Sequence, residues 1–158
     1  MTPNDLTEPA RLRRLMLTAL DIERKTIVEG RAVRPKFLAE DGLGNVMMFL
    51  ADWRDERDKG AMLAALKIAF RQKGVVRYVM ISEAWMAEQK EGDERMPSER
   101  HDRVDTLWCV GIEYGNRSIA LCKIAGVGKS RTVGSPEWDS FTNIEGRMAE
   151  LLPERVMQ

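Results

Sequence analysis

Cysteine and histidine are scarce in this sequence of 158 residues, which has two cysteines and one histidine. A structural zinc site takes about four ligands, so we expect neither a metal site nor a cofactor. Two cysteines are also too few for a disulfide scaffold, and we expect reduced thiols in a cytoplasmic protein. No apolar run reaches the roughly 18 residues of a membrane span, and the first residues lack the apolar core of a signal peptide. We therefore expect no membrane partner.

An excess of basic charge is also lacking, because the chain has 25 basic and 25 acidic side chains. Nucleic-acid binding proteins usually carry a basic excess, so the balance argues against a nucleic-acid partner. The charge is uneven along the chain, with a formal +3 over residues 1–36 and −3 over residues 88–105. Such segments can complement each other within one molecule or between two copies, which leaves a homodimer open.

Two helices have well-defined predicted ends in what we expect to be a single domain over residues 1–158. Apolar residues at helical spacing predict the first helix over about residues 7–28. Glu23 lies near the middle of its apolar stripe. A fraying helix end or a neighbouring arginine would explain this structurally, and a partly buried carboxylate would be a functional explanation. Asp58 is expected to cap the second helix, which Gly74 ends.

Three segments before residue 86 have the composition of β-strands. Residues 32–40 and 46–53 flank a glycine-containing turn at 41–45, which is typical of a hairpin. Because 46–53 is apolar at nearly every position, we expect it inside the sheet with both faces covered. Pro35 favours an edge position for the preceding strand. The β-branched and aromatic residues of 75–85 predict the central strand.

Residues 105–125 form the clearest predicted hairpin, with Gly115-Asn116 as a two-residue turn between apolar runs. This register places Cys109 opposite Cys122, on the face of the hairpin that carries small residues. Two small apolar side chains there let a helix pack closely, and we favour this interpretation over a redox switch. Reactive cysteines usually lie near a positive group and are partly exposed.

After the hairpin, AGVGKS at 125–130 looks like the end of a phosphate-binding loop. The first glycine of that motif would fall on Lys123, and no helix is predicted behind the loop. We expect a turn into a short last strand instead of nucleotide hydrolysis. Ser135-Pro136 is typical of a helix start, and a capping box at 142–145 predicts the last helix. The sequence thus predicts an α+β fold in the order α-β-β-α-β-β-β-(β)-α, with a mainly antiparallel sheet of about five to six strands and three helices.

Glu83 is the most conspicuous candidate for a functional side chain. It shares a face of the central strand with Val79 and Ile81, so a charge emerges from an apolar row. An ion pair with Arg77 or with an arginine of the first helix would explain it structurally. A role in acid/base chemistry or metal binding would explain it functionally, because site residues and structural ion pairs look alike at this level.

A long charged segment without periodicity follows at about 86–104. Loops of this length are uncommon inside compact domains and are often functional, although solvated charge is the simpler explanation. Its second half gathers groups that recognise an anion or an acidic patch. No catalytic residue is identified. The candidate binding residues at this strand end and loop are Glu83, Trp85, Ser98, Arg100, His101, Asp102 and Arg103.

The stretch Ile81–Trp85, followed by Pro97-Ser98-Glu99 and then by Asp102-Arg103, resembles a pattern in a widespread group of small uncharacterised bacterial and phage-associated proteins. The similarity covers roughly residues 33–125. The group has no established activity, so the resemblance implies no catalytic role. The positions that match its short motifs are Glu83, Trp85, Pro97, Ser98 and Arg103.

Two functions from different classes remain. The first is a non-catalytic accessory or regulatory protein that binds a protein partner or a small anionic ligand through the strand end and loop of residues 82–105. The alternative is a small metal-assisted hydrolase or nuclease that uses Glu83 with Asp102 or Glu23, because Mg²⁺ often takes only one or two protein carboxylates.

Overall fold

The computed structural model describes residues 8–86, 104–139 and 150–152 of the chain. These residues hold two α-helices, one short 3-10 helix and seven strands. The helices are α1 (Glu8–Val28), α2 (Glu56–Lys73) and the 3-10 helix η3 (Gly128–Ser130). The strands are β1 (Lys36–Asp41), β2 (Val46–Leu50), β3 (Val75–Met86), β4 (Val104–Glu113), β5 (Asn116–Ala125), β6 (Thr132–Val133) and β7 (Glu137–Asp139).

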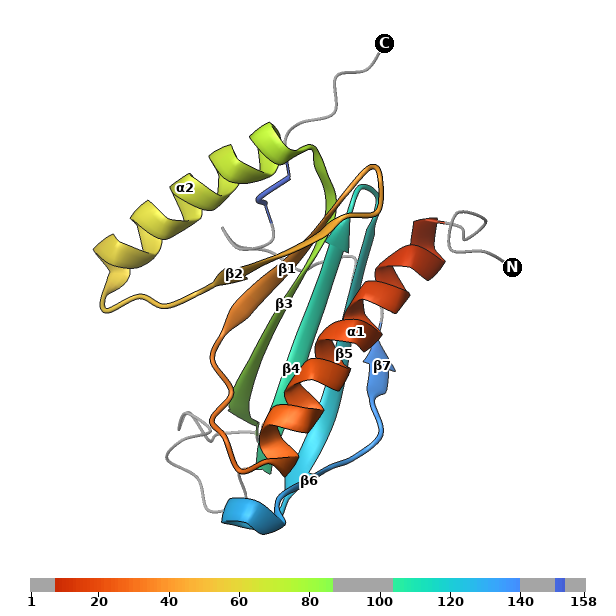
Figure 1. The fold of residues 1–158 in the computed structure, drawn as a ribbon, viewed down its shortest axis with the longest axis vertical. Coiled ribbons are helices and arrows are strands. Elements are labelled where there is room, and N and C mark those ends of the chain that lie inside the picture. The colour runs from red at the N-terminus through yellow and green to blue at the C-terminus, as the bar shows by residue number, and fades with distance from the viewer. Residues whose placement is uncertain (1–7, 87–103, 140–149, 153–158) are drawn as a thin grey trace, which may run out of the picture.

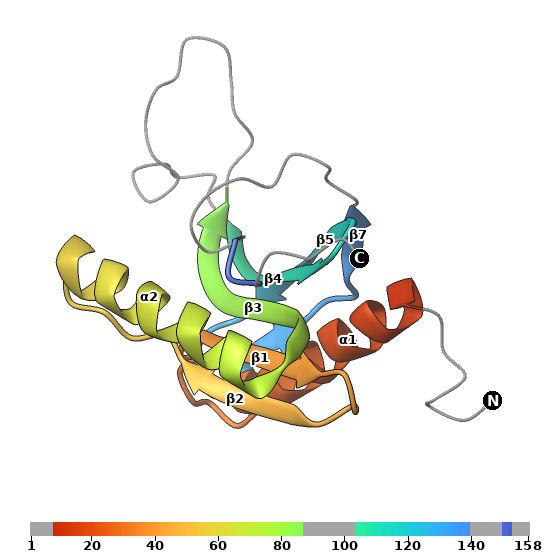
Figure 2. The same ribbon diagram turned by 90° about the horizontal axis from the view of Figure 1, so that it is seen from above.

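The strands form one sheet in the order β2-β1-β3-β4-β5-β6, and β7 also pairs with β5. Every strand pairing is antiparallel. Helix α1 covers one face of the sheet and α2 the other (Figures 1 and 2). The predicted α+β class with a mainly antiparallel sheet and a central strand at 75–85 is confirmed. Seven strands replace the expected five to six, and the described residues hold two α-helices where three were expected.

The sheet surface under α1, here called the α1 face, is built from alternate residues of four strands. Its buried apolar members are Leu38, Val79, Ile81, Leu107, Cys109, Ala120, Cys122 and Ile124. Helix α1 contributes the predicted stripe that includes Leu12, Met16 and Ala19, all almost completely buried. The helix ends in a Schellman arrangement, in which Gly30 has a φ of 78°. Apolar periodicity and a left-handed glycine thus explain both the face that α1 buries and its end.

Close contact between α1 and the sheet depends on Gly111 in β4. A Cβ atom at this position would lie 2.6 Å from Sδ of Met16 and 3.0 Å from a methyl carbon of Leu12. The α1 face therefore needs small residues where the helix crosses it, which confirms the predicted role of that face of the hairpin.

The opposite surface, here called the α2 face, has an aromatic centre. The ring centroids of Phe70 and Tyr78 lie 5.2 Å apart, and Phe49 of β2 meets Phe70 edge-on at 5.7 Å. Residues 150–152 also reach this face, because Leu151 is buried there and its amide donates to the Tyr78 hydroxyl at 3.4 Å. Burial raises the pKa of that hydroxyl. The phenol therefore stays protonated and anchors the described end of the chain.

Strand β2 corrects the predicted order of the first two strands. The apolar run was expected inside the sheet, but β2 is an edge strand and β1 lies inside between β2 and β3. Pro35 precedes β1, and its carbonyl accepts a hydrogen bond from the amide of Ala51. A proline just before a strand loses no ladder bond, so the residue did not indicate an edge.

The hairpin register also differs from the prediction, by two residues. Glu113 pairs with Asn116, so that the turn is Tyr114-Gly115, and Cys109 pairs with Ala120. Because the shift is even, each residue stays on its predicted face. Gly115 has a φ of 74°, which places the glycine at the second turn position instead of the first.

Two predicted helix signals were wrong in detail. Asp55, not Asp58, caps α2, and its side chain accepts from the amide of Asp58 at 2.8 Å. The Ser135-Pro136 segment leads into strand β7, because Trp138 pairs with Ala120 of β5 and packs against the α1 core. The capping box at 142–145 lies outside the described residues.

Candidate functional site

The end of the sheet where β3 stops and β4 begins, here called the loop end, flanks the charged segment of 87–103. Met86 pairs with Val104 and Trp85 with Asp105. The two ends of the segment therefore leave from neighbouring inner strands. Helix η3 and the start of β6 lie at the same end of the molecule, and the turns at 41–45 and 114–115 lie at the opposite end (Figure 1).

Glu83 lies at the loop end, on the same face of β3 as Val79 and Ile81, as alternation predicts, and α1 covers this face. Its carboxylate is about a quarter exposed and forms an ion pair with Arg131, which follows η3. The turn before Arg131 needs a glycine, because a Cβ atom at Gly126 would lie 2.5 Å from the carbonyl oxygen of Ser130. The predicted structural partners of Glu83, Arg77 and an α1 arginine, are both replaced by Arg131. Reasoning from local sequence missed this residue because it comes from a loop that no local pattern orients.

A second acidic side chain at the loop end is Glu23 of α1. It is fully buried and forms an ion pair with Lys36, the first residue of β1, which is itself 8% exposed. Lys36 pairs across the sheet with Ile81, two residues before Glu83. The ion pairs of Glu23 and of Glu83 thus lie at the same end of the α1 face. The second oxygen of Glu23, Oε2, has no hydrogen-bond partner among the described residues.

The pairing of the buried Glu23 with Lys36 is a structural explanation of this misfit that was not predicted from the sequence. Glu23 is neither a fraying helix end nor a carboxylate paired with an arginine, because Lys36 bonds to it inside the core. A buried ion pair recovers its desolvation cost only with good geometry. Glu23 and Lys36 therefore fix how α1 meets β1, and the charge of the carboxylate is compensated.

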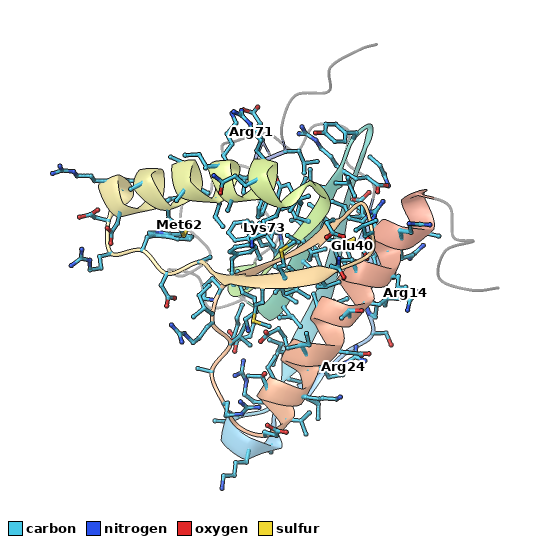
Figure 3. The ribbon with its side chains drawn as sticks, turned by 45° about the horizontal axis from the view of Figure 1, so that its top comes forward. Arg14, Arg24, Glu40, Met62, Arg71 and Lys73 are labelled. Atoms are coloured by element: carbon cyan, nitrogen blue, oxygen red, sulfur yellow. The ribbon has the colours of Figure 1, made fainter. Side chains whose placement is uncertain are left out.

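A third ionic cluster lies on the α1 face at the end opposite the loop end, near the turns at 41–45 and 114–115. The sequence analysis did not predict it. Arg77 is 1% exposed. Its guanidinium binds Glu40 of β1 and Glu113 of β4, the latter at 3.2 Å. The side-chain amide of Asn116 also donates to the Glu113 carboxylate, at 3.0 Å. Glu40 is labelled in Figure 3, which shows its position in the sheet. Correct pairing of β1, β3 and β4 would have predicted the cluster, since all three residues share one face.

A depression of about 290 Å³ lies between the N-terminal half of α1 and strands β5 and β7. Its lining consists of Leu12, Arg13, Met16, Asn116, Ser118, Trp138 and Asp139. The Arg13 guanidinium carbon lies 3.9 Å from the Trp138 ring centroid, and the Ser118 hydroxyl donates to the Asp139 carbonyl at 3.3 Å. These groups bond to one another, which favours a packing role.

The two cysteines are free thiols buried on the α1 face. Desolvation by burial raises the pKa of Cys109 and also that of Cys122, although Arg24 near Cys122 opposes the second shift. A raised pKa keeps the thiolate fraction low, and thiolate is the reactive form. The geometry therefore supports their predicted role as small apolar side chains.

The described residues contain no group of three or more histidine, cysteine, aspartate or glutamate side chains that would suit a metal ion. Neither α1 nor α2, the long helices in the described ranges, has an apolar stretch sufficient to cross a bilayer. Of the predicted site residues, Glu83 is described in full, and Trp85 is described only as a member of β3. Ser98, Arg100, His101, Asp102 and Arg103 lie outside the described residues, and their arrangement stays a prediction.

Comparisons with family models, with curated proteins and with solved structures found no match. No fold name, activity or ligand therefore carries over from a relative.

Proposed function

We propose that the protein is a non-catalytic accessory or regulatory protein that binds an anionic group, on a protein partner or a small ligand, through residues 82–105. The ion pair between Glu83 and Arg131 is the observation that carries this proposal. It compensates the negative charge at the rim of the sheet, next to the point where the charged segment leaves β3. A compensated carboxylate does not repel an approaching anion as a free one would.

The positive groups of the proposed site come from the segment itself. Arg100, His101 and Arg103 follow one another within four positions, just before β4 begins. Arginine recognises carboxylate and phosphate with paired hydrogen bonds, and a histidine adds a further donor. Both flanks of the segment are held by strand pairing, at Met86 and Val104. A sheet end of this kind is a fixed base for a binding loop.

The hydrolase or nuclease alternative uses Glu83 with Glu23 or with Asp102, and Asp102 lies outside the described residues. Glu23 is enclosed and bonded to Lys36, and Glu83 is bonded to Arg131. Each would have to leave a cationic partner before it could bind a metal. This cost favours the binding function over metal-assisted catalysis.

The test is a triple variant, Arg100→Ala/His101→Ala/Arg103→Ala, compared with a control of equal charge change on α2. The control is Arg57→Ala/Arg71→Ala/Gln72→Ala, whose three positions are exposed. Arg71 projects from α2 away from the sheet (Figure 3). Isothermal titration with a polyglutamate peptide and with inorganic phosphate separates a macromolecular anion from a small one.

We expect the wild type and the α2 control to bind one of the two probes, and the loop variant to lose at least about tenfold in affinity, because charged hydrogen bonds are lost. Equal binding by all three proteins would show that the loop is not the site. Absence of binding by the wild type to both probes would overturn the proposal itself. Thermal unfolding of the three proteins is measured alongside, so that a loss of binding can be separated from a loss of the fold.

A further inference from the structure

Strand β2 exposes an apolar row on the α1 side of the sheet edge. Val46, Met48 and Leu50 point to that side and are 49%, 53% and 47% exposed. Met47 and Phe49 alternate with them and pack against the α2 core. Figure 2 shows β2 at the margin of the sheet, beyond β1. The strand has the two-sided apolar composition of an inner strand, but only one of its faces is covered in the described part of the molecule.

The backbone of the same three residues also points outward. The amide of Ala51 donates to Pro35 at 2.9 Å and the amide of Asp41 donates to Asn45 at 3.0 Å. Because hydrogen-bonded positions alternate along an antiparallel ladder, residues 45, 47, 49 and 51 bond to β1. The N–H and C=O groups of Val46, Met48 and Leu50 therefore face away from β1, where no described strand meets them.

This edge lacks the usual protection against pairing with another chain. Edge strands are commonly interrupted by proline, charged by lysine or kept very short. Strand β2 has five residues and no charge or proline. The opposite margin of the sheet is divided between β6 with two residues and β7 with three. Of the two margins in the described chain, only that of β2 is continuous and apolar.

We propose that β2 pairs antiparallel with β2 of a second copy of this chain, around a twofold axis at Met48. Met48 then faces Met48 of the other copy, and Val46 faces Leu50. All three are positions whose backbone groups point outward, so the ladder gains about six hydrogen bonds, two for each pair. No other register centred on an outward-pointing residue pairs all three positions.

A second copy suits this edge because the strand is complementary to itself. The pairing brings no two charges together and buries no charge, since Val46–Leu50 contains none. Residues opposite each other lie on the same face, so the exposed row becomes one continuous apolar stripe across both copies. A closed twofold pair also uses up the open edge, which prevents further addition. The contact is short, so the dimer dissociates at low concentration.

The test is sedimentation velocity of the wild type and of Met48→Lys from about 1 μM to about 1 mM, a range that covers the affinities of small interfaces. The matched control is Leu17→Lys, because Leu17 is 45% exposed but lies on α1. We expect a concentration-dependent dimer for the wild type and the control. Met48→Lys should weaken the dimer at least about tenfold, since it places two like charges opposite each other.

A mixture of Met48→Lys with Met48→Glu should restore the dimer, because the two opposed charges then attract. A wild type that stays monomeric over the whole range would overturn the proposal. So would an unchanged dimer in Met48→Lys, or a mixture that associates no better than either variant alone. Growth of the wild type into larger species without a dimer plateau would exclude the closed twofold arrangement.

Discussion

Glu83 and Arg131 are separated by 48 positions in the sequence, and their side chains form an ion pair at the loop end of the sheet. One comes from the central strand and the other from the connection between η3 and β6. The pair therefore links the chain that follows β5 to the central strand β3, near the end of that strand.

Removal of this ion pair should cost little stability. We expect Arg131→Ala and Glu83→Ala each to lower the free energy of unfolding by about 1 kcal/mol, because both side chains are partly exposed to solvent. The double variant should lose less than the sum of the two by about 0.5 kcal/mol, which is the coupling of a direct pair. Urea unfolding of the wild type, the two single variants and the double variant measures this coupling energy. Strict additivity would contradict a direct interaction in solution.

The buried pair of Glu23 and Lys36 should behave differently. Lys36→Met leaves a carboxylate enclosed without its cation, and we expect a loss of about 3–5 kcal/mol. Glu23→Leu/Lys36→Met removes both charges and should recover most of that loss, since two apolar side chains suit the core. Urea unfolding with tryptophan fluorescence follows both variants. A double variant as unstable as Lys36→Met would mean that the pair also makes contacts that an apolar replacement cannot supply.

Gly111 should be intolerant of a methyl group. Gly111→Ala places a carbon 2.6 Å from Sδ of Met16, and we expect a loss of about 1–3 kcal/mol as α1 is displaced. Gly42→Ala is the control, because the nearest heavy atom to a Cβ there lies at 4.0 Å. Thermal unfolding should separate the two variants by several degrees. Equal melting temperatures would indicate that α1 packs less closely than described.

The 41–45 turn should respond to acid through Asp41. The Asn45 side-chain amide donates to its carboxylate at 2.9 Å and, with the Asn45 and Leu43 amides, holds the pKa of Asp41 below its ordinary value of 3.8. A lowered pKa in the folded state contributes stability above pH 3.8 that is lost as the pH falls through the folded value. Asn45→Ala should raise the pKa of Asp41.

A pH titration of carboxyl carbon shifts by NMR measures this change. Asp58 is the internal control, because hydrogen bonds from Arg54 lower its pKa and Asn45 is not among its partners. The pKa of Asp58 should stay the same in Asn45→Ala. A pKa of Asp41 that also stays the same would show that the Asn45 side chain does not bond to it in solution.

Local sequence patterns predicted which residues form helices and strands better than they predicted which strands pair in the sheet. The stripe of α1 and the Gly74 end of α2 were read correctly, because each depends on residues within a few positions. The predicted positions of β1 and β2 in the sheet were wrong. An apolar run indicates that a strand has apolar side chains on both faces, but it does not indicate which strands pair with it. The helix expected after Ser135 was also wrong, because pairing with β5 outweighs a helix-start signal.

In the candidate site, too, the position of a residue on its own strand was predictable, but its partner from a distant segment was not. Alternation along β3 correctly placed Glu83 on the same face as Val79 and Ile81. Its partner Arg131 was not predictable, because an ion pair between distant segments requires the whole path of the chain. Lys36 was missed as the partner of Glu23 for the same reason. The charges of the segment at 87–103 were readable from the sequence, and their binding role stays a prediction.

The packing of α1 has a consequence for synthesis of the chain. Helix α1 is translated before the sheet, and the residues that cover its apolar stripe include Leu107, Cys109 and Cys122 of β4 and β5. Among the described residues translated before β4 and β5, those that pack against the apolar side of α1 belong to β1, β3 and the segment that holds Val33. Truncation before residue 104 should therefore yield an insoluble product, because the apolar side of α1 then lacks the cover that β4 and β5 provide.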